Sequence, residues 1–227
     1  MPNRDDHDTA LHTAMNAIAA HFDHQHDLET TLAAVTGAAV DLIDGIDYAD
    51  VLTISDGEFR SLTPTNPIVT ELDQLQRSAG QGPCLEAAVG DSIVRSSDLR
   101  GDERWPLFAE GAVRRGIHSI LSFQLYTHER GAGALNLFGL APHEFDSESE
   151  TVGAMLATQA AVAIITDDRY HQFESALASR DLIGQAKGII MERYGIDAVA
   201  AFNMIRKLSQ DSNEKVALIA RRVVETR

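Results

Sequence analysis

A stretch of 48 residues, Ser147–Tyr194, contains no proline and repeats apolar residues at helical spacing. An unbroken helix of that length spans about 70 Å at 1.5 Å per residue, which exceeds the width of a small domain. The helix must therefore leave the domain in which it begins. The chain is expected to have two parts that share one long connecting helix.

The middle of this stretch carries three large apolar residues, Tyr170, Phe173 and Leu177, at three- and four-residue steps. Because no other segment of the chain is left to cover them, the spacing predicts a coiled coil with the same helix of a second copy. We therefore expect a homodimer. A helical linker that bends near residues 166–169 is the alternative explanation of the same pattern.

The carboxyl-terminal part predicts a bundle of three short amphipathic helices at residues 179–194, at 197–208 and after Asp211. Gly195 suits the left-handed position that closes the first helix, and Asp197 suits the cap of the second. Asp211 and Glu214 together predict a capping box at the start of the third helix. The expected core residues are Leu182, Ile183, Ala186, Ile189, Ile190, Ala201, Phe202, Ile205, Leu208, Val216, Ile219, Ala220, Val223 and Val224.

The region before the long helix alternates helical patterns with paired strand patterns, which is typical of an α+β domain with a mainly antiparallel sheet. Helices are expected at residues 28–43, at 68–77, after Pro83 and from Trp105 to Gly116. Strands are expected at Tyr48–Ser55, 59–63, 92–95, 117–126 and 134–140.

Composition supports a packed and cytoplasmic protein. The chain has 227 residues with 44% hydrophobic content, which is enough for one ordinary domain and one small one. No apolar run approaches the roughly 18 residues that a membrane span needs, and the acidic amino terminus does not resemble a signal peptide.

Two features suggest chemistry but have simpler explanations. The run at residues 21–26 contains three histidines, yet no second cluster completes a metal site, and residues 1–27 also fit a polar lead-in with one short amphipathic helix. Cys84 is the single cysteine, so it cannot form an intramolecular disulfide; it is either a reactive thiol or a small buried hydrophobe. No catalytic motif is present, so we expect neither an enzyme nor a bound cofactor or metal.

Charge divides the chain unevenly. Residues 1–176 hold 10 Lys and Arg against 28 Asp and Glu, a net −18, whereas residues 177–227 hold 9 against 6, a net +3, and together they give the overall −15. Phosphate contacts are made chiefly by Lys and Arg, so only the tail suits a nucleic acid. An ordinary solvated surface explains a charge of +3 equally well.

The tail resembles the ANTAR domain, an RNA-binding three-helix module of bacterial antitermination regulators. The resemblance is carried by Ser179, Arg180, residues 183–188, Met191, Gly195, Ala201, Phe202, Ser209, residues 211–213 and Lys215, and it departs from the family pattern at Glu214 and Ala217. It implies binding to RNA stem-loops. The candidate contact residues are Arg180, Gln185, Lys187, Arg193, Tyr194, Arg206, Ser209, Asn213 and Lys215.

The preceding region resembles the GAF sensory domain. The resemblance is carried by residues 82–85, Asp98, Leu99, residues 104–106, Gly116, Ile117, residues 119–123, residues 133–137, Phe145 and Asp146. GAF domains bind many small molecules or none, so the fold implies a possible ligand without naming it. The expected division is a sensory domain over 1–172 and an RNA-binding domain over 173–227.

The combined resemblances predict a signal-responsive regulator that prevents transcription termination by binding paired RNA stem-loops through its tail. The alternative is a GAF-based interaction module or small-molecule sensor whose tail contacts another protein. Some GAF-like proteins reduce methionine sulfoxide with cysteine thiols, but that cycle normally needs a resolving cysteine that this chain does not have.

Overall fold

The computed structural model describes residues 13, 15–16, 28–55, 58–90, 92–128 and 131–226. The chain forms two compact units, Met1–Asp167 and Asp168–Arg227. The helix α6, Ser147–Tyr194, is continuous over 48 residues and contributes to both units, as its spacing predicts. The histidine-rich run at 21–26 and most of the expected amino-terminal helix lie outside the described residues.

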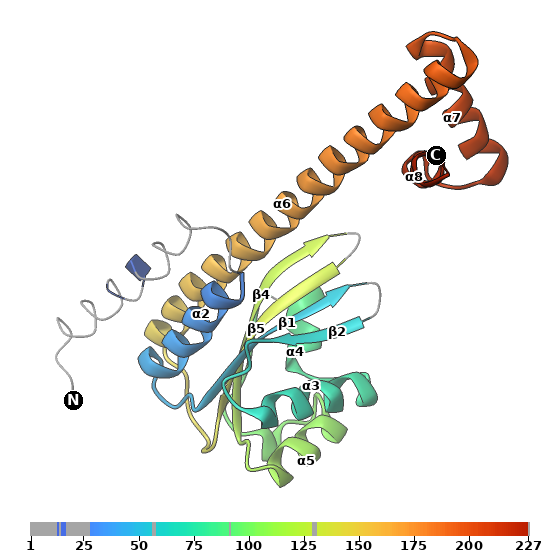
Figure 1. Cartoon of the computed structure of the whole chain (residues 1–227). Coiled ribbons are helices and arrows are strands. Elements are labelled where there is room, and N and C mark those ends of the chain that lie inside the picture. Colours follow the sequence, from blue (N-terminus) through green and yellow to red (C-terminus); the bar gives the residue numbers. More distant parts are fainter. Residues whose placement is uncertain are drawn as a thin grey trace. The chain divides into compact units, whose positions relative to one another are not determined.

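Unit 1 is built on an antiparallel sheet of five strands in the order β2-β1-β5-β4-β3 (Figure 1). Every pairing is antiparallel, which confirms the predicted α+β class. The strands are β1 (Tyr48–Ser55), β2 (Glu58–Leu62), β3 (Ile93–Ser96), β4 (Ser119–His128) and β5 (Gly131–Gly139).

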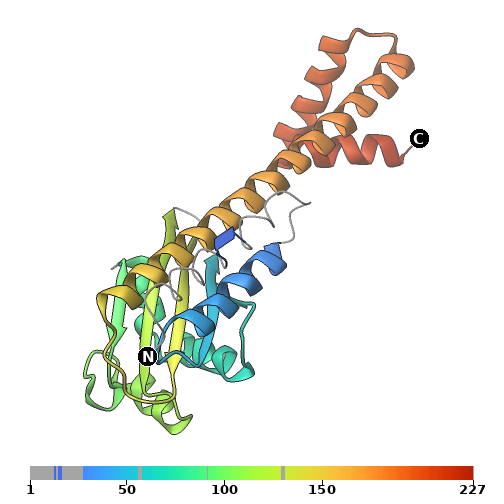
Figure 2. The same ribbon diagram turned by 90° about the vertical axis from the view of Figure 1, so that its left-hand side faces the viewer.

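Helices cover both faces of this sheet (Figures 1 and 2). One face packs against α2 (Leu28–Leu42) and the first half of α6, and the other against α3 (Pro67–Ala79), α4 (Pro83–Val89), the short 3-10 helix η1 (Leu99–Gly101) and α5 (Pro106–Arg114). Because side chains alternate along a strand, Val51 joins the first core and Leu52 the second. The sheet therefore separates two hydrophobic cores.

The first half of α6 packs on the same face of the sheet as α2. Val152, Leu156, Ala160 and Ile164 are buried against the sheet at three- and four-residue steps. Among the described helices, α6 alone is long and apolar enough to cross a membrane, by length and composition only. Of the apolar stretch that meets this condition, 44% is buried inside the fold.

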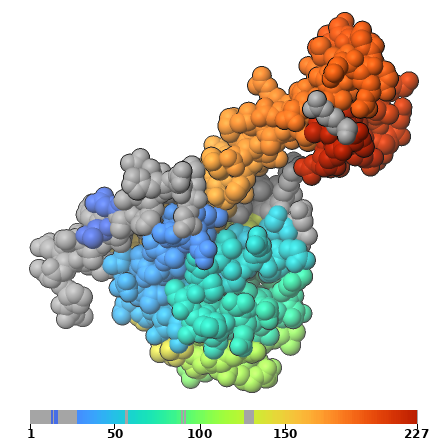
Figure 3. Space-filling model, viewed as in Figure 1, coloured from blue at the N-terminus to red at the C-terminus, as the bar shows by residue number. Residues whose placement is uncertain are grey.

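Unit 2 is a bundle of three helices. The end of α6 packs against α7 (Ala198–Ser212) and α8 (Val216–Glu225), whose red atoms lie next to the orange ones of α6 in Figure 3. The core that they share consists of Ala186, Ile190, Ala201, Ile205, Ile219 and Ala220. This confirms the predicted bundle, but Phe202 and Leu208 are exposed and do not join its core.

The predicted capping box after Asp211 is wrong. Helix α7 continues to Ser212 and ends because Asn213 adopts the left-handed conformation, with φ of 54°. The Asn213 and Glu214 amides donate to the carbonyls of Gln210 and Ser209, at 3.3 and 3.1 Å, which is the Schellman pattern of a helix end. Glu214 instead forms an ion pair with Arg222.

Close packing of α6 on the sheet predicts an unequal response of two helical glycines. A Cβ at Gly153 would meet the Phe123 ring at 2.2 and 2.3 Å, whereas one at Gly37 of α2 meets nothing within 4 Å. Gly153→Ala should therefore lower the free energy of unfolding by about 1–3 kcal/mol. Gly37→Ala should raise it by up to about 1 kcal/mol.

The measurement is denaturant unfolding followed by fluorescence of Trp105, the only tryptophan of the chain, which is buried in unit 1. A Gly153→Ala variant as stable as the parent would contradict the close contact between α6 and β4.

Candidate RNA-binding surface and sensory domain

The surface of unit 2 presents several cations without an internal partner. The exposed basic residues are Arg180, Arg193, Arg206, Lys207, Lys215, Arg221 and Arg222, and Lys187 is half-buried. Of these, only Arg222 forms an ion pair within the described part of the chain. The other charged groups are free to contact phosphates.

Three candidate residues lie along one side of α6. Arg180, Lys187 and Tyr194 are seven residues apart, and a helix drifts by only about 20° over seven residues. We call these three residues the cationic line. Its two cations and the Tyr194 ring, which is 59% exposed, face the same side of the helix.

Gln185 and Arg193 do not share that side. At about 100° per residue they lie roughly 140° from Arg180, in opposite directions around the helix. Both are exposed. Helical geometry therefore distributes the five candidates of α6 over three sides, and one flat ligand cannot contact all of them.

The remaining four candidates come from α7 and the turn that follows it. Arg206 and Lys215 are exposed, and neither has an ion-pair partner among the described residues. The Ser209 hydroxyl donates to the Glu214 carbonyl, and Asn213 supplies the left-handed turn residue. Ser209 and Asn213 therefore both stabilise the turn between α7 and α8.

Two exposed glycines, Gly184 and Gly188, were not among the predicted site residues. Gly184 lies between Arg180 and Lys187 on the same side of α6, and Gly188 follows Lys187. A Cβ at either position meets nothing within 4 Å, so packing inside the chain does not require glycine. Glycine weakens a helix interior but permits close approach of another molecule to the backbone. The sequence contained a signal for this feature, because two glycines four residues apart interrupt an otherwise strong helical pattern.

Unit 1 buries a pair of carboxyl groups between the sheet and α3. Asp50 of β1 accepts hydrogen bonds from the Ser61 hydroxyl (2.7 Å) and the Asn136 amide (3.0 Å). Asp73 of α3 is also buried. Burial first, then the nearby charge of Asp50 and the hydrogen bond between the two carboxyl groups, raise the pKa of Asp73 to about 10. Asp73 therefore holds a proton that it shares with Asp50.

Cys84 lies beside this pair as a fully buried thiol. Gln76 fixes it from α3: its amide donates to the sulfur at 2.8 Å, and its carbonyl oxygen accepts from the Cys84 backbone N–H at 2.9 Å. Gly82 leaves room for Gln76, because a Cβ there would lie 2.2 Å from that oxygen. Burial and the nearby acids raise the pKa of the Cys84 thiol, so it stays protonated and does not suit thiolate chemistry.

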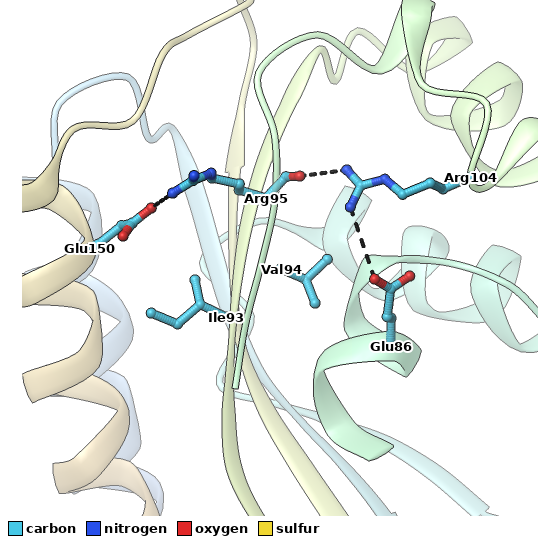
Figure 4. Close-up of a pocket in the computed structure, with 6 residues that line it drawn as sticks. All are labelled: Glu86, Ile93, Val94, Arg95, Arg104 and Glu150. Carbon is cyan, nitrogen blue, oxygen red and sulfur yellow. Dashed lines mark hydrogen bonds and ion pairs between the residues drawn. The ribbon is translucent and has the colours of Figure 1, made fainter. Parts of the chain in front are cut away.

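A surface cavity of about 270 Å³ lies at the β3 edge of the sheet (Figure 4). Its lining consists of Glu86, Ile93, Val94, Arg95, Arg104 and Glu150. Two Arg and two Glu make the lining neutral, and all four are paired.

The ion pairs in this cavity involve three elements, β3, α4 and α6, because Arg104 also lies 3.9 Å from Glu86 of α4. Arg95 of β3 forms an ion pair with Glu150 in the first turn of α6. Arg104 binds Asp102 at 2.7 Å and the Arg95 carbonyl at 2.6 Å, and it stacks on the Trp105 ring at 4.1 Å. No group of three or more metal-ligating side chains occurs among the residues described.

Comparison with known families agrees with this two-unit organisation. Residues 25–165 match the GAF domain family, and residues 171–224 match the ANTAR domain family. The chain belongs to the GAF domain family and carries an ANTAR domain. The predicted GAF–ANTAR architecture is confirmed. An ANTAR domain implies an RNA-binding antitermination regulator, and a GAF domain implies a sensory part.

Solved structures show the same GAF fold at low identity. The GAF domain of a phosphoenolpyruvate-protein phosphotransferase from Coxiella burnetii is 16% identical with a TM-score of 0.57, covering 72% of this chain and 98% of its own. Free methionine-R-sulfoxide reductase from Neisseria meningitidis, solved with its substrate, is also 16% identical with a TM-score of 0.54, covering 72% and 91%. No curated protein matches the chain. At these identities the likeness shows the fold alone.

The shared proton makes stability of the GAF domain depend on pH. The pKa of Asp73 is about 10 in the folded protein, against 3.8 in the unfolded chain. Its contribution to the free energy of unfolding is therefore complete below about pH 4 and is lost as the pH rises toward 10. At pH 7 the loss is at most about 4 kcal/mol. Asp73→Asn supplies a permanent donor to Asp50, so it should raise stability at pH 8 and flatten the pH dependence.

Trp105 fluorescence during denaturant unfolding between pH 5 and 9 measures this effect. Asp41→Asn, at an exposed acid of α2, is the matched control and should change little. A parent protein of constant stability across this range would show that no proton is shared.

The exposed glycines of the ANTAR domain give a second prediction. Gly184→Ala and Gly188→Ala should each stabilise the helix by about 0.5–1 kcal/mol, and both should weaken RNA binding if RNA approaches the backbone there. Thermal unfolding by circular dichroism and RNA titration measure the two effects. Gly195→Ala is the control, because a φ of 63° there makes alanine destabilising. Unchanged RNA affinity in both stabilised variants would place the RNA on another side of α6.

Proposed function

We propose that the protein is a signal-responsive regulator whose ANTAR domain binds paired RNA stem-loops and thereby prevents a terminator from forming. The observation that supports this most is the cationic line of α6. Its two cations have no ion-pair partner among the described residues, and an exposed Tyr194 follows them on the same side.

This combination suits an RNA loop better than a regular duplex. Loop bases are unstacked and can stack on an aromatic ring, while flanking phosphates pair with Arg and Lys. Arg180 and Lys187 supply the charges and Tyr194 the ring. Arg206 and Lys215 add exposed cations from the other helices of the bundle.

The GAF domain supplies the signal in this proposal. Its neutral cavity is bordered by Glu150, which belongs to the first turn of α6. A small molecule that competes for Arg95 would release Glu150 and alter how the start of α6 is held. Such a ligand shifts the protein only by its differential affinity for the two arrangements. The proposal includes a homodimer and a cytoplasmic location.

A protein-binding tail is the second candidate function. Phe202, Met204 and Leu208 of α7 and Leu218 of α8 are large apolar residues with exposed side chains. Scattered exposed apolar residues are common, whereas a contiguous patch marks an interface. A thiol-based reductase is less well supported, because Cys84 is buried and its thiol remains protonated.

A charge reversal on the cationic line tests RNA binding. Lys187→Glu should lower affinity for paired stem-loops by roughly tenfold or more, because a phosphate contact is lost and a like charge is added. The slope of log affinity against log salt should also fall by about 1. Helicity should be unchanged, since Lys187 is outside the bundle core.

Lys207→Glu makes the same charge change at an exposed position of α7 and serves as the matched control. Stem-loop RNA, scrambled hairpins and duplex DNA are titrated with both variants. Equal losses in the two variants would indicate a general charge effect, and no loss in either would favour the protein-binding tail.

A further inference from the structure

The cavity at the β3 edge contains one guanidinium group that the fold holds in place from several directions. Arg104 donates through Nε and Nη2 to the two carboxylate oxygens of Asp102, at 2.9 and 2.7 Å, and through Nη2 to the Arg95 carbonyl at 2.6 Å. The guanidinium carbon also lies 4.1 Å from the centroid of the Trp105 ring. A side chain that is already ordered in this way loses little further conformational entropy when it binds a ligand.

The remaining nitrogen of Arg104 faces an acid across a gap. Glu86 of α4 places its Oε1 3.9 Å from Arg104 Nη1, which is too long for a hydrogen bond (Figure 4). Glu86 is held as well, because its Oε2 accepts from Trp105 Nε1 at 2.9 Å. The side chains of Arg104 and Glu86 are 46% and 34% exposed, so a dissolved molecule can reach both. The cavity therefore presents a donor and an acceptor side by side, each on an ordered side chain.

The rest of the lining adds a second ion pair and an apolar surface. Arg95 pairs with Glu150, and Ile93 is partly exposed beside them. The volume of about 270 Å³ is below the roughly 300–1,000 Å³ of pockets that take drug-sized molecules. The ligand that fits is therefore small and carries polar groups that match the two ends of the gap.

These two ends call for opposite groups on one molecule. A carboxylate is the strongest acceptor for the Nη1 hydrogens of Arg104, and an ammonium group is the matching donor to Glu86 Oε1. A simple carboxylate would leave Glu86 without a donor, and a simple amine would leave Nη1 without an acceptor. An α-amino acid carries both groups on one carbon atom, close enough to bridge a gap of 3.9 Å with an ordinary hydrogen bond at each end.

We propose that this cavity binds a free α-amino acid, with its carboxylate on Arg104, its ammonium group on Glu86 and its side chain against Ile93. The inference rests on the proposed function, in which this cavity receives the signal, and it names the class of ligand. A carboxylate at Arg104 lies beside β3, where it competes with Glu150 for Arg95. Because Glu150 belongs to the first turn of α6, occupation of the cavity changes how that turn is held.

Titration of the full chain with each standard α-amino acid tests this proposal. Isothermal titration calorimetry gives the dissociation constants, and Trp105 fluorescence reports on the cavity because Trp105 contacts both Arg104 and Glu86. At least one amino acid should bind at millimolar concentration, change the Trp105 emission and raise the unfolding temperature. Its N-acetyl derivative lacks the ammonium group and its carboxamide lacks the carboxylate, so each should bind roughly tenfold more weakly or worse.

Glu86→Gln removes the charge of the acid but keeps an acceptor for Trp105 Nε1. It should weaken amino-acid binding by roughly tenfold and leave the unfolding temperature of the ligand-free protein nearly unchanged. Glu110→Gln is the matched control, because it makes the same change at an exposed acid of α5 that pairs with Arg114. The proposal is overturned if no standard amino acid binds, if either derivative binds as tightly as its parent amino acid, or if Glu86→Gln binds as tightly as the unaltered protein.

Stem-loop RNA is then titrated in the presence and absence of the amino acid that binds. RNA affinity that the amino acid leaves unchanged contradicts the signal role in the proposed function, and a lack of RNA binding contradicts its RNA part. Neither result alters the calorimetric test of the cavity, so the two failures can be told apart.

Discussion

One continuous helix has to satisfy three different environments along its length. The first half of α6 buries Val152, Leu156 and Ile164 against the sheet, and its last turns bury Ala186 and Ile190 in the three-helix core. Between them the helix is exposed on all sides. Continuity of hydrogen bonding through that exposed stretch makes α6 the covalent and mechanical element common to the GAF and ANTAR domains.

Much of the fold was predictable because it depends on periodicity. The apolar spacing of α6, the strand Tyr48–Ser55 and the left-handed glycine at Gly195 are local patterns, and the structure has each of them where the sequence placed it. The turn between α7 and α8 was mispredicted because two signals competed. Asp211 and Glu214 fit a capping box, but α7 continues through Asp211 to Ser212 and ends at Asn213 in the left-handed conformation, so Lys215 is the N-cap of α8.

The sites were less predictable, for a physical reason. Helical phase alone places Arg180, Lys187 and Tyr194 together, whereas Ser209 is engaged in a turn that only the fold reveals. The acidic pair of the GAF domain was not predicted at all. Asp50 and Asp73 belong to a strand and a helix that meet only after folding, and nothing near either residue marks it as buried.

The exposed stretch of α6 at residues 168–178 also sets the rotation of the cationic line about the helix axis relative to Tyr170 and Phe173. Insertion of one residue there would turn the cationic line by about 100° relative to Tyr170 and Phe173, whereas seven residues would return it almost to its former side. A change in the length of this stretch therefore keeps that rotation nearly unchanged only in steps of two helical turns. The residue types within the stretch do not alter that rotation, because each residue of an α-helix turns the chain by the same angle.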